Sequence, residues 1–144
     1  MQEFTLASQV TLYVLLAMLG LYFILLWVWQ IKVLKGGTMP NPDGTVDDYK
    51  QHKLLYGIAA ADVFLACPLA IAGIVLALLS SKWGFFILSL ESFFFVWFNT
   101  AATITSLRFQ NPKLSPDWFI TFPSGAILGL AYLIWTVIHF DVIF

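Results

Sequence analysis

Two acidic residues, Asp62 and Glu91, lie inside long apolar stretches of this chain. Glu91 falls in the segment SLESFFFVWFNTA, residues 89–101, among aromatic and small residues. An ionisable side chain at the centre of a membrane helix costs about 2.5 to 3.5 kcal/mol on insertion scales, so those that persist usually face protein or water and often bind protons or ions. Glu91 is therefore a candidate proton-binding or ion-binding group.

The rise of a helix places the polar residues of these stretches at two depths. Asp62 follows Lys53, and Asn99 precedes Arg108, by about 13 Å along a helix in each case, so we expect Asp62 and Asn99 to hydrogen-bond. Glu91 is expected nearer the opposite surface, so a paired-carboxylate dyad is not expected. The predicted inner cluster comprises Asp62, Asn99 and Thr103, and the predicted outer cluster comprises Gln9, Tyr13, Glu91, Tyr132, Thr136 and His139. The alternative is that these residues only hold the helices together through hydrogen bonds.

Glycine and proline mark two further features of the apolar stretches. Gly125 and Gly129 form a GxxxG pattern, which lets two helices approach closely, so we expect them at a helix–helix contact. Pro68 frees the carbonyl of Phe64 one turn earlier, which offers an oxygen to an ion or to water near Asp62. Prolines with purely structural roles are also common in membrane helices.

Metal, haem and phosphate patterns are absent from the sequence. His52 and His139 are expected at opposite ends of the molecule, so one chain cannot clamp a haem between them. With the single Cys67, an apolar packing residue, they supply no three-ligand or four-ligand metal site. The loop of residues 36–44 lacks the Lys-Ser/Thr pair that completes a phosphate-binding loop. We predict no metal, no cofactor and no catalytic residue, and we lean against an enzyme.

The elements that must position these residues are long and apolar. The chain of 144 residues is 60% hydrophobic and 10% charged, whereas soluble domains are about 25% charged. Residues 6–33, 54–79, 83–107 and 118–140 each provide the roughly 20 residues of a membrane helix. Strands would leave backbone groups unpaired in lipid. We predict an all-α fold, an integral membrane bundle of four transmembrane helices with up-down topology that forms a single domain over residues 1–144.

Capping residues predict where two of these helices begin. Ser115, Pro116 and Asp117 are typical of a helix start, because serine caps the first turn and proline suits its first position. Thr45 followed by Asp48 resembles a capping box. The second helix is therefore expected to begin in water, before it enters the membrane near Leu54.

The basic residues predict the orientation in the membrane. Of the 7 Lys and Arg, all but Lys82 lie within or beside the loops of residues 34–53 and 108–117. Loops rich in Lys and Arg stay in the cytoplasm, so we expect both termini on the non-cytoplasmic side of a plasma (inner) membrane. A net charge of -1 leaves no basic stripe for nucleic acid.

Three function classes fit these observations. The first is a non-enzymatic accessory or assembly subunit of a larger membrane complex, which the aromatic surfaces favour, since the chain has 14 Phe. An alternative is a homo-oligomeric transporter of a small solute, ion or proton that uses Glu91. A second alternative is a membrane enzyme directed to lipid or quinone, with Glu91 and His139 as acid and base. The expected partners are the lipid bilayer and either further copies of the chain or other membrane subunits.

Overall fold

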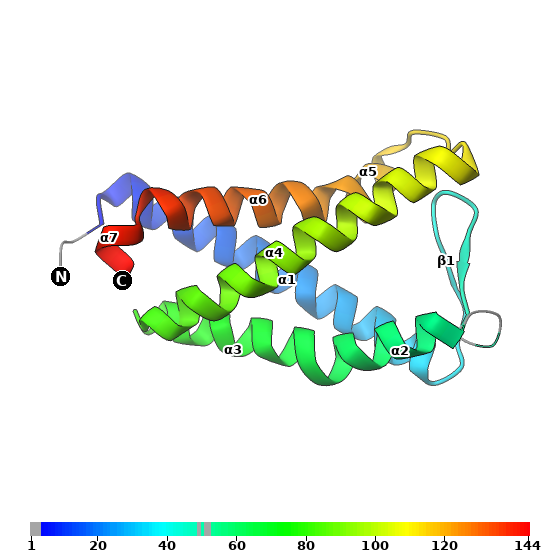
Figure 1. Ribbon diagram of the computed structural model, residues 1–144, viewed down its shortest axis with the longest axis horizontal. Coiled ribbons are helices and arrows are strands. Elements are labelled where there is room, and N and C mark those ends of the chain that lie inside the picture. The colour runs from blue at the N-terminus through cyan, green and yellow to red at the C-terminus, as the bar shows by residue number, and fades with distance from the viewer. Residues whose placement is uncertain (1–3, 49, 51–52) are drawn as a thin grey trace.

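The fold is that of a mostly helical chain, seen in a computed structural model that describes residues 4–48, 50 and 53–144. Three helical stretches are long and apolar enough to cross a membrane, and they agree closely with the first three predicted spans. The first is α1, the second joins α2, η1 and α3, and the third joins α4 and η2 (Figure 1). Their bounds are α1 Leu6–Leu34, α2 Lys53–Ala61, η1 Asp62–Ala66, α3 Cys67–Leu78, α4 Lys82–Thr105 and η2 Ser106–Gln110.

The fourth apolar stretch is divided into shorter helices. They are α5 Pro116–Thr121, α6 Pro123–Ile138 and α7 Phe140–Ile143. Ser115 caps α5 as predicted, with its hydroxyl accepting from the amide of Trp118 at 3.2 Å. The break at Phe122 precedes Pro123, which has no N–H and whose ring clashes with the carbonyl one turn back in a regular helix. The longest uninterrupted helix in this stretch therefore has 16 residues.

Helix α4 is the centre of the arrangement. It packs extensively against α6 and α3, and α1 packs against α2, α3 and α6 (Figure 1). The start of α1 and the C-terminus lie at one end of the molecule together with the turn between α3 and α4, and we call this the terminal end (Figure 1). The other end carries the connection from α1 to α2 and the connection from η2 to α5, and we call it the hairpin end.

A short hairpin replaces the helix start predicted at Thr45. Strand β1, Met39–Pro40, pairs antiparallel with β2, Val46–Asp47. Thr45 donates through both its amide and its hydroxyl to the Asp43 carboxylate, at 3.0 and 2.6 Å, and so closes the turn instead of capping a helix. Burial raises the pKa of Asp43, but hydrogen bonds led by those from Thr45 bring it below its ordinary value. Because Val46–Asp47 is a strand, no helix begins at Thr45 and the predicted capping box is wrong; the described part of α2 begins at Lys53.

Glycines let α4 approach its neighbours closely. An added Cβ on Gly129 would lie 2.7 Å from the backbone oxygen of Ser92, and one on Gly125 would lie 2.5 Å from the side chain of Asn99. Near the terminal end, a Cβ on Gly84 would collide with the backbone of Ala77. Closely approaching backbones of this kind are the usual way that helices pack where no water drives their association.

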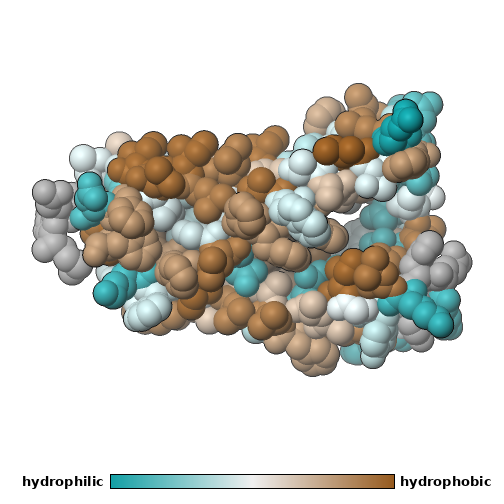
Figure 2. Space-filling model, viewed as in Figure 1, coloured by the Kyte–Doolittle hydropathy of each residue, from teal (hydrophilic) through white to brown (hydrophobic). Residues whose placement is uncertain are grey.

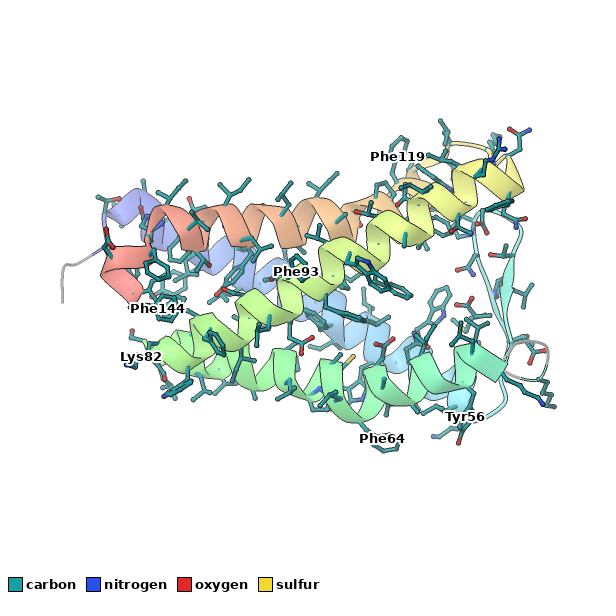
Figure 3. The ribbon with its side chains drawn as sticks, in the orientation of Figure 1. Tyr56, Phe64, Lys82, Phe93, Phe119 and Phe144 are labelled. Carbon is teal, nitrogen blue, oxygen red and sulfur yellow. The ribbon has the colours of Figure 1, made fainter. Side chains whose placement is uncertain are left out.

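Most of the surface along the helices is apolar. Hydrophobic residues cover most of the visible face, and hydrophilic residues gather mainly at the two ends (Figure 2). Phe64 and Phe119 project outward, with 78% and 51% of their surfaces exposed (Figure 3). The buried core in turn is formed by residues such as Leu16, Leu19 and Phe23. Because the apolar residues face outward as well as inward, the surface suits lipid as its solvent.

Candidate functional site

Asp62 begins a widened turn in the middle of the second long helix. The amide of Cys67 donates to the carbonyl of Asp62, which is the i to i+5 bond of a π-helix. Pro68 explains the widening, because it lacks an N–H and its ring would clash with the carbonyl of Phe64 in a regular α-helix. Turns of this kind inside α-helices occur often at functional sites.

The carboxyl group of Asp62 is held by a glutamine from another helix. Its side chain is only 5% exposed, and its Oδ2 accepts a hydrogen bond of 2.8 Å from Gln30 Nε2 of α1. In the described ranges, no Lys, Arg or His forms an ion pair with Asp62. A buried carboxyl therefore has an amide partner but no basic one.

Glu91 lies on α4, which packs extensively against α3 but makes no comparable contact with η1, the turn that begins with Asp62. The thiol of Cys67, which directly follows the widened turn, is completely buried. Depths counted along each helix had separated the two acids. Helix α4 runs obliquely across the bundle (Figure 1), and the expectation that the two acids form no dyad stays a prediction. Glu91 is half-buried and has no hydrogen bond to any residue that the structure describes.

The side chains of Asn99 and Thr103 form hydrogen bonds within their own helix, α4. Asn99 Nδ2 donates to the carbonyl of Phe95 at 2.9 Å, and the hydroxyl of Thr103 donates to the carbonyl of Asn99 at 2.6 Å. The expected bond between Asp62 and Asn99 is therefore not formed. Gln30 donates to the Asp62 carboxyl instead, and the side chain of Asn99 packs against Gly125.

Most members of the predicted outer cluster have local partners. The Gln9 amide donates to the carbonyl of Phe4 at 3.2 Å, and the side chain of Tyr13 is 54% exposed. The hydroxyl of Thr136 lies near that of Tyr132 but donates to the Tyr132 backbone carbonyl at 3.0 Å. Among the described residues, no hydrogen bond joins these side chains to Glu91.

His139 meets a serine that the sequence had not singled out. Its two ring nitrogens lie 2.7 Å from the carbonyl oxygen of Trp135 and 2.8 Å from the hydroxyl of Ser8. His52 lies outside the described residues. Within the described part of the chain, no group of three His, Cys, Asp or Glu side chains could hold a metal ion.

Four buried polar atoms have no hydrogen-bond partner among the described residues. They are Trp27 Nε1, Ser92 Oγ, the Tyr132 hydroxyl and Trp135 Nε1. Buried polar groups are normally bonded to protein or to ordered water. Two of the four, in Ser92 and Tyr132, belong to α4 and α6, which form the largest helix contact of the molecule.

The residues missed in the sequence are Gln30 and Ser8. Gln30 lies in an apolar stretch beside Trp29 and close to Lys32, and this pattern is typical of the polar end of a membrane span. Ser8 reads as part of a helix start. The signal that could have found Gln30 is its isolation: it is a lone amide in the run LWVWQIKVL.

Comparison of the chain with protein-family models, with curated proteins and with solved structures gave no match.

Proposed function

We propose that this chain is a four-span membrane protein with up-down topology, whose fourth span is formed by α5, α6 and α7 together. The hairpin end carries Lys32, Lys35, Lys50, Lys53, Arg108 and Lys113. By the positive-inside rule this end faces the cytoplasm, which leaves both termini outside a plasma (inner) membrane.

The proposed function is proton-coupled or cation-coupled transport, with Asp62 and Glu91 as the binding groups. The observation that carries the proposal is the buried carboxyl of Asp62, which Gln30 holds through a hydrogen bond and which has no basic partner among the described residues. A negative charge inside an apolar helix bundle is costly. Each of these carboxyls would therefore bind a proton or a cation while it is enclosed, and release it when water reaches it.

The shape of the hairpin end supports access to this pair from the cytoplasm. Helix α2 packs against α1 but makes no comparable contact with α4. At the hairpin end, the surface is hollowed between the part of the molecule that contains α2 and the part that contains the end of α4 (Figure 2). Trp29, the neighbour of Gln30, donates to Asp47 of the hairpin at 3.1 Å. Movement of the hairpin would therefore act on Trp29, which is the residue next to Gln30, the hydrogen-bond donor to Asp62.

Passage to the opposite face requires more than one copy of the chain. Four helices leave little room for an aqueous path, and the contact between α4 and α6 is closed by Gly125 and Gly129. The unbonded hydroxyls of Ser92 and Tyr132 are where internal water would be held along that contact. We propose a homo-oligomer in which neighbouring copies complete the outer half of the path.

Ion flux into liposomes tests this proposal. The purified chain is reconstituted at a fixed membrane potential, and internal pH is followed with a trapped dye. We expect Asp62→Asn and Glu91→Gln each to reduce proton entry to the level of empty liposomes. Asp141→Asn, which removes an exposed carboxyl near the C-terminus, should keep the wild-type rate. Wild-type flux in both carboxyl variants, or none in the wild type with any of H⁺, Na⁺ and K⁺, would refute the proposal.

A second candidate function is that of a non-enzymatic subunit in a larger membrane complex. The observation that favours it is an apolar groove of about 410 Å³ at the terminal end, between α4 and the α6–α7 segment. Its lining residues are Phe86, Ser89, Leu133, Thr136, Val137, Phe140 and Phe144. Native mass spectrometry after gentle extraction separates the two functions: multiples of 16.2 kDa indicate a homo-oligomer, and a fixed ratio with another chain indicates a subunit.

A further inference from the structure

A serine in the first turn of α1 is hydrogen-bonded to the histidine that directly follows α6. The Ser8 hydroxyl lies 2.8 Å from His139 Nε2, although 131 residues separate the two in the chain. Both side chains are half-buried at the terminal end, at the edge of the apolar region. They take no part in the carboxyl pair proposed for transport.

The hydrogen bonds fix which nitrogen of His139 carries the proton. Nδ1 lies 2.7 Å from the carbonyl oxygen of Trp135, and a carbonyl oxygen can only accept. Nδ1 therefore holds the hydrogen, which leaves Nε2 as the acceptor for the Ser8 hydroxyl. This is the protonation state in which a histidine acts as a general base toward serine.

Aromatic rings hold the imidazole in place. It stacks on Trp135 with ring centroids 4.3 Å apart and meets Phe4 edge-on at 5.5 Å. A histidine at the end of a helix commonly bonds a free carbonyl there, and this accounts for the bond to Trp135. It does not account for the second bond, which reaches a serine on another helix.

We propose that Ser8 and His139 are a nucleophile and general base that cleave carboxylic esters of lipids at the outer surface of the bilayer. A nucleophile in hydrogen-bonding distance of a base, with the base oriented by a third group, is the arrangement that activates serine. The substrate class follows from the position. The pair lies among the aromatic rings of Phe4 and Trp135 at the end of apolar helices, and in a membrane-spanning chain the ends of the apolar helices meet the interfacial region of the bilayer.

The chemistry balances with water as the only co-reactant. Ser8 Oγ attacks the ester carbonyl carbon while its proton moves to His139 Nε2. The bond from that carbon to the alkoxy oxygen then breaks, and Nε2 gives the proton to the departing alcohol. Water next attacks the acyl-serine and leaves a proton on Nε2, which returns it to Ser8 Oγ as the carboxylic acid departs.

Neighbouring groups suit the negative charge that develops in these steps. The Thr5 hydroxyl donates to Ser8 Oγ at 3.0 Å. The amides of Leu6 and Ala7, in the first turn of α1, have no acceptor among the described residues, as is usual for the first amides of a helix.

A fluorophosphonate probe tests the assignment, because it labels only activated serine hydroxyls. Wild-type protein in lipid nanodiscs is treated with the probe, and the modified peptide is found by mass spectrometry. We expect one adduct, on Ser8, and none in Ser8→Ala. The matched control is Thr11→Ala, which removes a hydroxyl one turn further along that bonds only its own helix, and it should be labelled normally. Labelling elsewhere, or none in the wild type, would overturn the assignment.

Hydrolysis of a fluorogenic ester lipid in vesicles provides the second measurement. We expect His139→Gln to lose turnover while it keeps the helical circular dichroism of the wild type. Thr11→Ala should hydrolyse the lipid at the wild-type rate, and both Ser8→Ala and Thr11→Ala should keep wild-type proton entry, so failure of this proposal and failure of the transport proposal are distinguishable. Unchanged hydrolysis in His139→Gln would remove it as the base.

Discussion

Asp62 depends on Gln30, because lipid offers no hydrogen bond to a buried carboxyl. The amide of Gln30 donates one bond of 2.8 Å, and the widened turn at Asp62–Ala66 carries the acid at its first position. Amide donation also leaves the site free to change its charge, since no fixed cation is present among the described partners. A glutamine at this place thus suits reversible binding better than a lysine would.

Removing the glutamine donor should destabilise the bundle. Gln30→Leu leaves a buried acceptor without its partner, which costs about 1 to 3 kcal/mol. The check is the free energy of unfolding in detergent, with Gln9→Leu as the control, since Gln9 bonds only a part-buried carbonyl near the N-terminus. We expect the loss from Gln30→Leu to shrink in an Asp62→Leu background. Strictly additive losses would show that the two side chains do not interact.

Residue types alone pointed to Asp62 and Glu91 but not to their relation. A carboxyl in an apolar stretch is easily noticed in a sequence, because inserting an ionisable side chain into the membrane is unfavourable and such residues are usually functional. The partner of Asp62 could not be predicted, since Gln30 reaches it through the rotation of α1 about its axis, which no local pattern fixes. Ser8 was missed for the same reason: its partner His139 comes from the far end of the chain.

At the scale of elements, close backbone contacts set how the helices cross. Gly129 lies against the backbone of Ser92, and Gly84 lies against that of Ala77. Backbone atoms cannot swing aside as a side chain can. These two glycines therefore fix the path of α4 between α6 and α3, and with it the place of Glu91.

Substitution of glycine by alanine should destabilise the protein where the glycine is in tight contact with another helix, and should not do so where it faces open space. Gly129→Ala and Gly84→Ala are each expected to cost about 1 to 3 kcal/mol, the usual cost of overpacking. Gly57→Ala is the matched control, because a Cβ there meets nothing within 4 Å, and it should be neutral or stabilise α2 by up to about 1 kcal/mol. Equal thermal midpoints for all three variants would contradict the packing described here.

Long helices were easier to predict than their interruptions. Apolar length located three spans to within a few residues, because each must be continuous to satisfy its own backbone in lipid. The hairpin escaped prediction, since strands of two residues carry no periodic pattern. The break at Phe122 has a visible cause in Pro123, but proline near a helix start is also compatible with an unbroken helix.

For the whole molecule, the features divide between the two ends. The hairpin end holds most of the basic residues, and the surface is hollowed there (Figure 2). The terminal end joins the first and last helices through Ser8 and His139 and carries the apolar groove. Transport and ester cleavage are thus proposed for separate parts of the molecule, so variants can test each without the other.

Infrared spectroscopy of the reconstituted protein tests most directly whether Asp62 and Glu91 exchange protons with water. A protonated carboxyl gives a C=O stretching band that is well separated from the bands of carboxylates and of backbone amides. We predict a band whose intensity changes reversibly with the pH of the medium, and which weakens in Asp62→Asn and in Glu91→Gln and is lost in the double variant. A band that does not respond to pH, or one that survives in the double variant, would contradict reversible proton binding by this pair.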